Sequence, residues 1–307
     1  LEAGMDKAGE IDYLTKIIKP DFGIITNISY AHAKNFKNIK HIAIAKSEII
    51  GNIKDGGSLI LNADDPFYNF HKKIAQKRNL KIKSFSLVKK SSEINLHLVK
   101  KENMKYKVYI NIDKMTKYFY INSNFENHIK NLLAAVSIIT TFKNIKELDS
   151  NIFYNYKTPN GRGDISTIRA FKKKIHLIDE SYNSNPLSLK SAIKNFDKMN
   201  VNSSKKHVIL GDMLELGKYS KKLHVEISKN INKTSINSVN VIGEHIKETY
   251  RNINESKKGL ILKKSSEIID LIKNNINNND YLMIKGSNST GLNKITNNIK
   301  VGKINAL

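Results

Sequence analysis

The stretch from Ile175 to Pro186 reads IHLIDESYNSNP and indicates how the second half of the chain is built. Its first five residues, Ile175 to Asp179, have the length and apolar content of a buried strand. Asn185 and Pro186 then make a good helix start, because the asparagine side chain can cap free N–H groups and proline has no N–H to leave unpaired. The stretch therefore predicts a strand, a polar loop and a helix.

The same pattern recurs along the second half of the chain. Besides the strand of Ile175 to Asp179, strands are predicted at 165–171, 207–210, 238–242 and 281–284. The last three are each followed by a polar loop and a helix. Such repeats are typical of a small doubly wound α/β domain, in which ligands bind at the carboxyl ends of the strands.

The first half of the chain also alternates between strands and helices, which predicts an α/β fold. Strands are expected at 22–28 and 58–62 and helices at 38–53, 126–142 and 145–154. Short runs with partial period-2 alternation predict hairpins on a mixed sheet, at 82–87, 93–99, 105–112 and 117–121. The turn-rich segment from Thr158 to Gly163 reads TPNGRG and predicts a boundary between domains at 1–163 and 164–307.

Composition excludes several classes of protein. The 307 residues suffice for about two domains, and cysteine is absent, which excludes disulfide frameworks, cysteine-ligated zinc and cysteine nucleophiles. A reducing cytoplasm fits this composition. No apolar run approaches the ~18 residues of a membrane span. The segment Leu1 to Asp6 lacks the basic and apolar regions of a signal peptide.

The net charge of +24 raises the possibility of a nucleic-acid partner. Arginine, which recognises phosphates and bases through its planar fork, occurs at four positions only, and the lysines are scattered. They accompany many asparagines and isoleucines, as AT-rich codons would produce. We therefore expect no nucleic-acid partner. A lysine-rich nucleic-acid-binding protein is the alternative from a different class, and it predicts steep salt dependence of binding.

Neither common phosphate-binding loop occurs in the sequence. The nearest match to G-x-x-x-x-G-K-[ST] is Gly211 to Tyr219, which has one residue too many between its glycines and tyrosine in place of the hydroxyl that binds Mg²⁺. There is no G-x-G-x-x-G either. If the protein uses a nucleotide, its main phosphate cradle lies outside this chain.

Eight motifs occur in the order seen in the Mur ligases of peptidoglycan synthesis, which the chain resembles from Leu1 to about Leu292. They are LEAGM (1–5), GEI (9–11), TNI with AH (26–32), IAIAKSEI (42–49), LNADD (61–65), DESYNSNP (179–186), GDMLELG (211–217) and KGS (285–287). The last three are most similar to the branch that adds D-alanyl-D-alanine. Any one of these motifs is weak evidence, but their common order is specific.

The resemblance implies a fold, an activity and a set of small-molecule partners. The fold would be part of the central ATPase domain, a mixed sheet with helices, followed by a Rossmann-like carboxyl-terminal ligase domain. The activity would be ATP- and Mg²⁺-dependent amide formation through an acyl phosphate, joining D-alanyl-D-alanine to UDP-N-acetylmuramoyl-tripeptide. A cytoplasmic monomer is expected. The milder alternative is another Mur-type amide ligase.

Three residues match the metal-binding positions of the family. Glu2 and His32 match metal ligands, and Lys46 matches a lysine whose carbamylation gives an anion that helps to hold the metal. His32 and Lys46 are therefore the catalytic candidates. We expect Glu2 to end a strand, His32 to lie in a loop after a strand and Lys46 to lie within an apolar-faced helix. Without the resemblance, His32 would be a loop or capping residue and Lys46 a solvated lysine, and Asp64 with Asp65 is interpreted as a turn and helix start.

Three residues match nucleotide contacts of the family, and Asn183 is a fourth nucleotide-binding candidate. Asn131 matches an adenine contact, Arg162 a phosphate-binding arginine and Glu180 an acidic ribose contact, while Asn183 lies in the same loop as Glu180. Taken alone, Asn131 would be a polar residue on a helix face and Glu180 a solvated acid. Arg162 lies between glycines, where its guanidinium could reach a nucleotide as the domains close.

The expected substrate-binding residues lie at strand ends of the second half. Asn185, Lys285 and Ser287 should face the cleft, and Lys285 to Ser287 before a helix suits an anion. Asp212, with Glu215, could meet the ammonium group of the dipeptide or cap the next helix. His224 is assigned to helix packing.

The sequence departs from the family pattern in three ways. Asn127 and His128 stand where the family commonly has His-Asn or His with an aromatic residue, which bears on the adenine contact. Glu180 stands where many members have aspartate. The amino-terminal uridine-nucleotide-binding region and the P-loop are absent, so we expect these 307 residues alone to be inactive.

Overall fold

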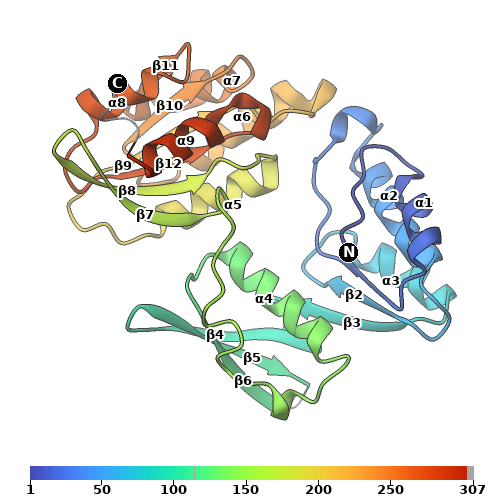
Figure 1. Cartoon of the computed structure of the whole chain (residues 1–307). Coiled ribbons are helices and arrows are strands. Elements are labelled where there is room, and N and C mark those ends of the chain that lie inside the picture. Colours follow the sequence, from blue (N-terminus) through green and yellow to red (C-terminus); the bar gives the residue numbers. More distant parts are fainter. Residues whose placement is uncertain (114, 303–307) are drawn as a thin grey trace. The chain divides into compact units, whose positions relative to one another are not determined.

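The computed structural model describes residues 1–113 and 115–302, which form two compact units, Leu1–Lys157 and the residues from Thr158 onward (Figure 1). Among these described residues, no helix is both long enough and apolar enough to cross a membrane. Each unit has its own six-stranded sheet and its own apolar core. The predicted α/β class is confirmed.

The sheet of the first unit has the strand order β1-β2-β3-β4-β5-β6. Neighbours from β1 to β4 are parallel, and β4, β5 and β6 form an antiparallel meander, as the partial alternation predicted. The strands are β1 (Phe22–Ile25), β2 (Ser58–Asn62), β3 (Lys81–Ser86), β4 (Ile94–Glu102), β5 (Lys105–Ile112) and β6 (Met115–Ile121).

Four α-helices accompany this sheet: α1 (Glu10–Ile18), α2 (Ile39–Gly51), α3 (Tyr68–Lys77) and α4 (Glu126–Ile139). Helix α2 begins where Asn38 accepts a hydrogen bond from the His41 N–H at 3.2 Å. The apolar side of α4, which includes Leu133 and Val136, packs with the sheet residues Ile60 and Phe119 in one buried cluster. These packed side chains anchor α4 to the sheet.

Two expectations for the first unit are wrong. The predicted helix at 145–154 is only a 3₁₀ turn, Ile145–Glu147, because Asn144 and Asp149 accept hydrogen bonds from backbone N–H groups two residues onward, which competes with helix formation. The strand expected to end at Glu2 is absent, since residues 1–5 form neither helix nor strand. The first predicted strand, 22–28, ends earlier, at Ile25. Helix α1 was not predicted, and of α3 only the start near Asp64 and Asp65 was predicted.

The second unit is the doubly wound domain expected from the sequence, with the order β11-β10-β9-β12-β8-β7. Only β7 is antiparallel to its neighbour. The strands are β7 (Asp164–Ala170), β8 (Lys173–Glu180), β9 (Lys206–Gly211), β10 (Ser238–Ile242), β11 (Lys258–Leu262) and β12 (Tyr281–Lys285), and the helices are α5 (Pro186–Asp197), α6 (Ser220–Ile231), α7 (Lys247–Asn252), α8 (Glu267–Asn275) and α9 (Leu292–Lys300).

Helix α5 begins where the sequence predicted. The Asn185 side chain accepts from the Ser188 N–H at 2.9 Å, and the Ser188 hydroxyl accepts from the Asn185 N–H at 3.0 Å, which completes a capping box. Strand β11 was missed because four of its five residues are exposed or only partly buried, so no buried apolar run marks it.

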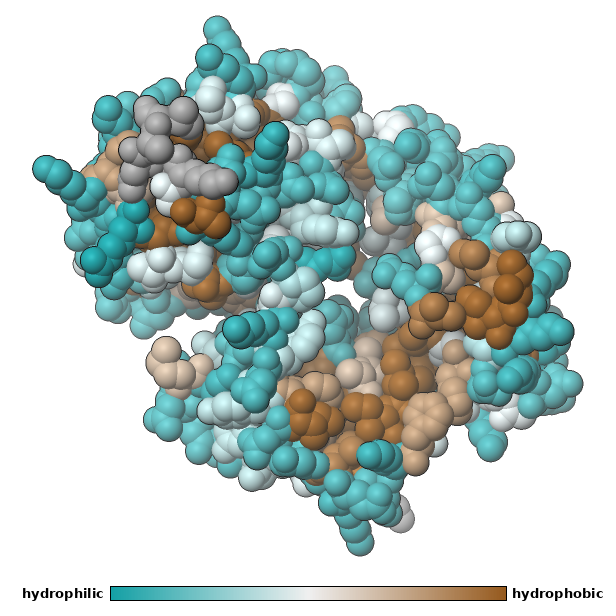
Figure 2. Space-filling view, in the orientation of Figure 1, coloured by the Kyte–Doolittle hydropathy of each residue, from teal (hydrophilic) through white to brown (hydrophobic). Residues whose placement is uncertain are grey.

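The two units differ in the surface that they show. In Figure 2, apolar side chains gather on the visible face of the first unit, whereas the visible face of the second unit is mostly hydrophilic. The exposed apolar residues of the first unit include Tyr13, Ile17, Ile44 and Phe142.

Candidate active site

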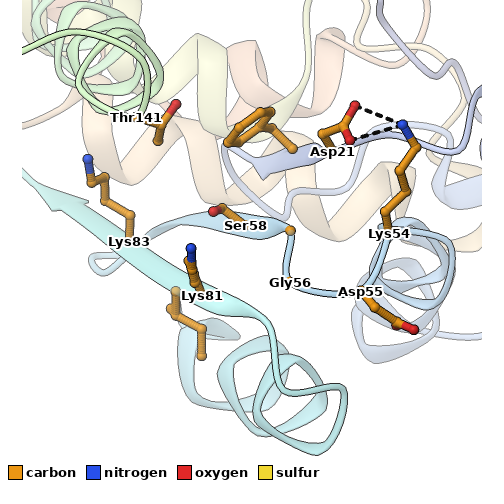
Figure 3. Close-up of a pocket in the computed structure, with 11 residues that line it drawn as sticks. Asp21, Lys54, Asp55, Gly56, Ser58, Lys81, Lys83 and Thr141 are labelled. Atoms are coloured by element: carbon orange, nitrogen blue, oxygen red, sulfur yellow. Dashed lines mark hydrogen bonds and ion pairs between the residues drawn. The ribbon is translucent and has the colours of Figure 1, made fainter.

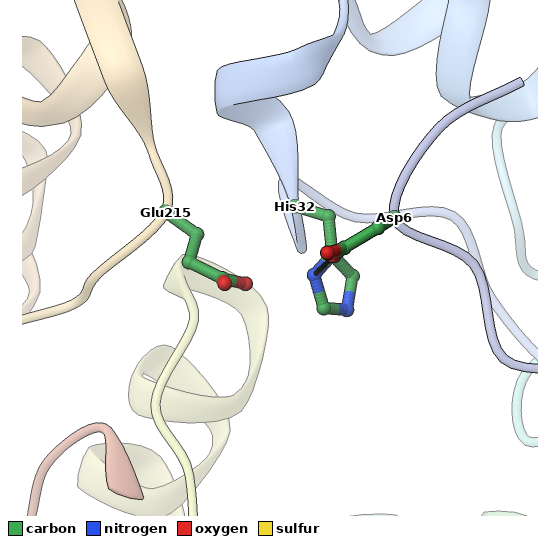
Figure 4. A group of neighbouring side chains, drawn as sticks. All are labelled: Asp6, His32 and Glu215. Atoms are coloured by element: carbon green, nitrogen blue, oxygen red, sulfur yellow. Dashed lines mark ion pairs between the residues drawn. The ribbon is translucent and has the colours of Figure 1, made fainter. Parts of the chain in front are cut away.

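The carboxyl ends of β1 and β2 present the first group of predicted site residues. His32 lies in the loop after β1, as expected, in a left-handed conformation with φ of 56°. Its Nδ1 lies 2.8 Å from Oδ1 of Asp6, and Figure 4 shows the carboxylate beside the ring. The contact joins the loop after β1, which carries His32, to the amino-terminal segment that carries Asp6.

Lys46 lies inside α2, as predicted, and its side chain is partly buried. Its ammonium group donates to the Asn27 carbonyl at 3.2 Å. Burial lowers the pKa of Lys46, and the carboxylates of Asp65 and Glu2 act in the opposite direction. Glu2 and Lys46 therefore lie close enough for their charges to interact, although Glu2 itself is exposed.

Asp64 and Asp65 form the turn that the sequence predicted between β2 and α3. Asp65 accepts from the Ile28 N–H at 2.7 Å and from the Phe67 N–H at 2.8 Å, while Asp64 accepts from the Leu87 N–H at 2.7 Å. Hydrogen bonds from backbone N–H groups to a carboxylate are strong. The two side chains thus tie together the segments that follow β1, β2 and β3.

Glu48 is a positioning residue that the sequence reasoning missed. Its carboxylate accepts from the Gly9 N–H at 2.8 Å and from the Asp12 N–H at 3.1 Å, so it caps the start of α1. The two partners lie 39 and 36 residues away, and no local pattern could reveal them.

In the second unit, Lys285 is enclosed at the end of β12. Its side chain is 1% exposed, and its ammonium donates to the Asn183 carbonyl at 2.9 Å and lies 3.4 Å from Oε2 of Glu180. Burial lowers the pKa of Lys285, whereas Glu180 favours the charged form. Lys285 therefore ties the loop after β8 to β12.

Ser287 and Asn183 lie in the same group. The Ser287 hydroxyl donates to the Ser184 carbonyl at 3.2 Å and accepts from the Leu214 N–H at 2.9 Å, which joins the loops after β8, β9 and β12. Asn183 is exposed, and its Oδ1 accepts from the Ser184 N–H at 2.7 Å. The side chain of Asn185 is engaged as the cap of α5.

Asp212 and His224 order the loop after β9. Asp212 accepts from the Ile246 N–H at 2.7 Å and from the Glu244 N–H at 3.1 Å, so it holds the start of α7 rather than that of the next helix, α6. His224 is fully buried, and its Nε2 accepts from the Met213 N–H at 3.1 Å while its Nδ1 lies 2.8 Å from the Ser220 carbonyl. That packing role is the one the sequence predicted.

The remaining candidates are exposed. The Arg162 guanidinium lies over the Tyr182 ring, 4.4 Å from its centroid, which is a cation–π contact within the second unit. Asn131 lies on the exposed side of α4 in the first unit, and the nearby His128 ring lies 5.5 Å from that of Phe125. The structure thus gathers Glu2 with Lys46 in one unit, and Glu180, Asn183, Lys285 and Ser287 in the other.

Comparison with known protein families gives one match in each unit. Residues 1–139 match the Mur ligase middle domain, and residues 166–288 match the Mur ligase, glutamate ligase domain. The chain belongs to the Mur ligase family. The resemblance seen in the motifs is therefore confirmed in both units.

Named relatives of this Mur ligase chain include two UDP-N-acetylmuramoyl-tripeptide–D-alanyl-D-alanine ligases. The ligase from Rickettsia prowazekii is 29% identical, and the match covers 96% of this chain and 64% of the relative. The ligase from Buchnera aphidicola subsp. Acyrthosiphon pisum is 31% identical, and the match covers 97% of this chain and 64% of the relative. The chain thus spans about two thirds of the length of these relatives.

Solved structures share the fold. MurF ligase from Thermotoga maritima in complex with ADP superposes with a TM-score of 0.84 at 20% identity, over 100% of this chain and 67% of that one. MurF from Acinetobacter baumannii superposes with a TM-score of 0.82 at 21% identity, over 97% of this chain and 63% of that one.

Proposed function

We propose that this Mur ligase chain supplies the catalytic and amino-substrate parts of an ATP-dependent ligase that adds D-alanyl-D-alanine to UDP-N-acetylmuramoyl-tripeptide. The observation that carries the proposal is that relatives of that name match along nearly the whole of both units. The tripeptide carboxylate would be phosphorylated by ATP, and the dipeptide amine would then displace phosphate from the acyl phosphate. We further propose a cytoplasmic monomer.

Glu2, His32 and Lys46 are proposed to hold Mg²⁺ at the carboxyl end of β1. A carboxylate and an imidazole suit this role, although Mg²⁺ prefers oxygen ligands, so a third oxygen donor is needed. Carbamylation of Lys46 would supply it: neutral Nζ attacks CO₂, one proton leaves and a carbamate anion forms. The partial burial of Lys46 supports this step, since burial disfavours the ammonium form. Bound Mg²⁺ would offset the negative charge that develops during both chemical steps.

The nucleotide is proposed to contact Asn131 through its adenine, Arg162 through a phosphate and Glu180, with Asn183, through its ribose. Arg162 is exposed and makes a cation–π contact with the Tyr182 ring. Charge-assisted hydrogen bonds to a phosphate are stronger than such a contact, so the guanidinium can turn to bind a phosphate. Glu180 is held by Lys285, so its carboxylate would be in place before a ribose arrives. That preorganisation supports the assignment.

Asn185, Asp212, Lys285 and Ser287 are proposed to shape the site of the amino substrate. Their side chains fix the loops after β8, β9, β10 and β12. The backbone of these loops would then present the dipeptide amine to the acyl phosphate.

The test joins the chain to the remaining third of the Buchnera relative and measures phosphate release from ATP with UDP-N-acetylmuramoyl-tripeptide, with and without D-alanyl-D-alanine. We expect release that depends on the dipeptide and that falls at least about a hundredfold in Lys46→Ala. Binding of ADP, measured separately, shows that the fusion is folded. If a fusion that binds ADP released phosphate at the same rate with and without D-alanyl-D-alanine, the proposal that this dipeptide is the substrate would be wrong.

A further inference from the structure

A pocket opens at the amino ends of β1, β2 and β3, the edge of the first sheet opposite to Glu2, His32 and Lys46. It encloses about 500 Å³, within the range of small-molecule sites. Its lining comes from the residues before β1, the loop before β2, the first half of β3 and the segment after α4 (Figure 3).

The strand register places the polar groups of this pocket side by side. Phe22, Ser58 and Lys81 are register partners on three adjacent parallel strands, so their side chains share one face of the sheet. Lys83, two residues further along β3, lies on the same face. Figure 3 shows the Ser58 hydroxyl and the ammonium groups of Lys81 and Lys83 on the side where Thr141 lies.

The charges of the pocket leave two cations in excess. Lys54 pairs with Asp21 at 2.9 Å, and Asp55 lies 3.4 Å from an Arg78 nitrogen. Lys83 donates to the Thr140 hydroxyl at 3.0 Å, and that hydroxyl donates onward to Val136. Across the described part of the chain, neither Lys81 nor Lys83 makes an ion pair with a carboxylate. Both ammonium groups therefore keep N–H donors for a ligand.

Ser58 supplies the second, independent observation. The residue as a whole is 8% exposed and lines the pocket, and within residues 1–113 and 115–302 its hydroxyl makes no hydrogen bond. Because the hydroxyl oxygen faces the pocket rather than being sealed inside the protein, it is free to hydrogen-bond to a ligand there. This hydroxyl and the two ammonium groups share one side of the sheet.

We propose that this pocket binds a phosphate monoester. The phosphate would accept from Lys81, Lys83 and the Ser58 hydroxyl, and its organic substituent would lie against Phe22, whose ring packs on Phe142 with centroids 4.5 Å apart. Lysine binds phosphate as a point charge without requiring the fork of arginine. The site lies at the other edge of the sheet from the proposed catalytic residues, so the inference stands without the ligase function.

Titration of the 307-residue chain with inorganic phosphate and with phenyl phosphate, followed by NMR of the residues lining the pocket, tests the proposal. We expect saturable shifts with both probes and tighter binding of phenyl phosphate. Lys81→Gln and Lys83→Gln should each weaken binding about tenfold, whereas Lys101→Gln, which removes an exposed charge elsewhere in the unit, should leave it unchanged. Equal affinity for both probes would restrict the site to free phosphate and overturn the monoester.

Ser58→Ala separates a ligand site from a structural one. Because the hydroxyl has no partner among the described residues, its removal should leave the melting temperature unchanged or raise it, while phosphate binding weakens several-fold. Absence of saturable shifts at ~10 mM of either probe, or shifts unaffected by the three pocket variants in folded protein, would overturn the proposal.

Discussion

Both sheets carry family motifs at the carboxyl ends of parallel strands, but the polar side chains near those ends are used differently in the two units. In the second unit, the side chains of Asp212, Lys285 and Ser287 make hydrogen bonds to the backbone of neighbouring loops. In the first unit, Glu2 is exposed and Lys46 donates one hydrogen bond to a carbonyl. The difference is that Lys285 is locked among loops, whereas Glu2 and Lys46 remain available beside the turn that Asp64 and Asp65 hold.

The largest effect is expected from Lys285→Met. Removal of the ammonium leaves the buried Glu180 carboxylate without its counter-charge, so unfolding of the second unit should become easier by about 3 kcal/mol. Urea unfolding followed by circular dichroism measures the loss, and hydrogen exchange of β8 and β12 locates it. Adding Glu180→Gln should restore part of the stability. A cost below about 1 kcal/mol would show that the second unit does not depend on this pair.

Asp212→Ala should have the next largest effect. It removes the acceptor of two backbone N–H groups, at Glu244 and Ile246, which should cost about 2 kcal/mol. Asp212→Asn keeps one acceptor oxygen and should cost about half as much. Hydrogen exchange at 244–246 reports the change directly. Unaltered protection there would mean that the start of α7 is held by other contacts.

A pH dependence is expected from His224. Burial lowers its pKa in the folded state, with Asp212 and Glu248 opposing and His245 reinforcing the shift. Its contribution to stability is therefore complete above the ordinary pKa of about 6.5 and is lost as the pH falls below that value, by up to about 1.4 kcal/mol per pH unit.

Chemical unfolding between pH 7.5 and 5 checks this expectation. His224→Gln should flatten the dependence in the second unit, whereas His245→Gln, which removes only a minor cause of the lowered His224 pKa at an exposed ring, should change the slope slightly. An unchanged slope in His224→Gln would assign the pH dependence to another group, such as the buried His207.

The smallest effect is expected from Lys46→Met. Burial already disfavours the ammonium, and its hydrogen bond to Asn27 is long, so the free energy of unfolding should change by less than about 0.5 kcal/mol. The same urea assay measures it beside Lys285→Met. If Lys46→Met and Lys285→Met lowered the free energy of unfolding equally, the two sheet edges would not differ in the way described above.

Much of the fold was predictable because its signals are local. The strand of β2 and the start of α5 follow from runs of apolar residues and from a capping asparagine. One of the failures is local as well. A helix was predicted at 145–154, but Asn144 and Asp149 offered the backbone competing hydrogen bonds. Helix α1 has a clear apolar side, yet its start depends on the distant Glu48.

The sequence alone determined the α/β class, the order of the motifs and the positions after strands of His32, Asn183 and Ser287. The tertiary structure decided which of those residues are engaged and which remain available. Lys285 resembled a free anion-binding lysine until its contact with Glu180, 105 residues away, placed it inside the protein. Only the strand register showed that Ser58 and Lys81 lie side by side on one face of the sheet. Burial and long-range pairing depend on the path of the whole chain, so no local pattern records them.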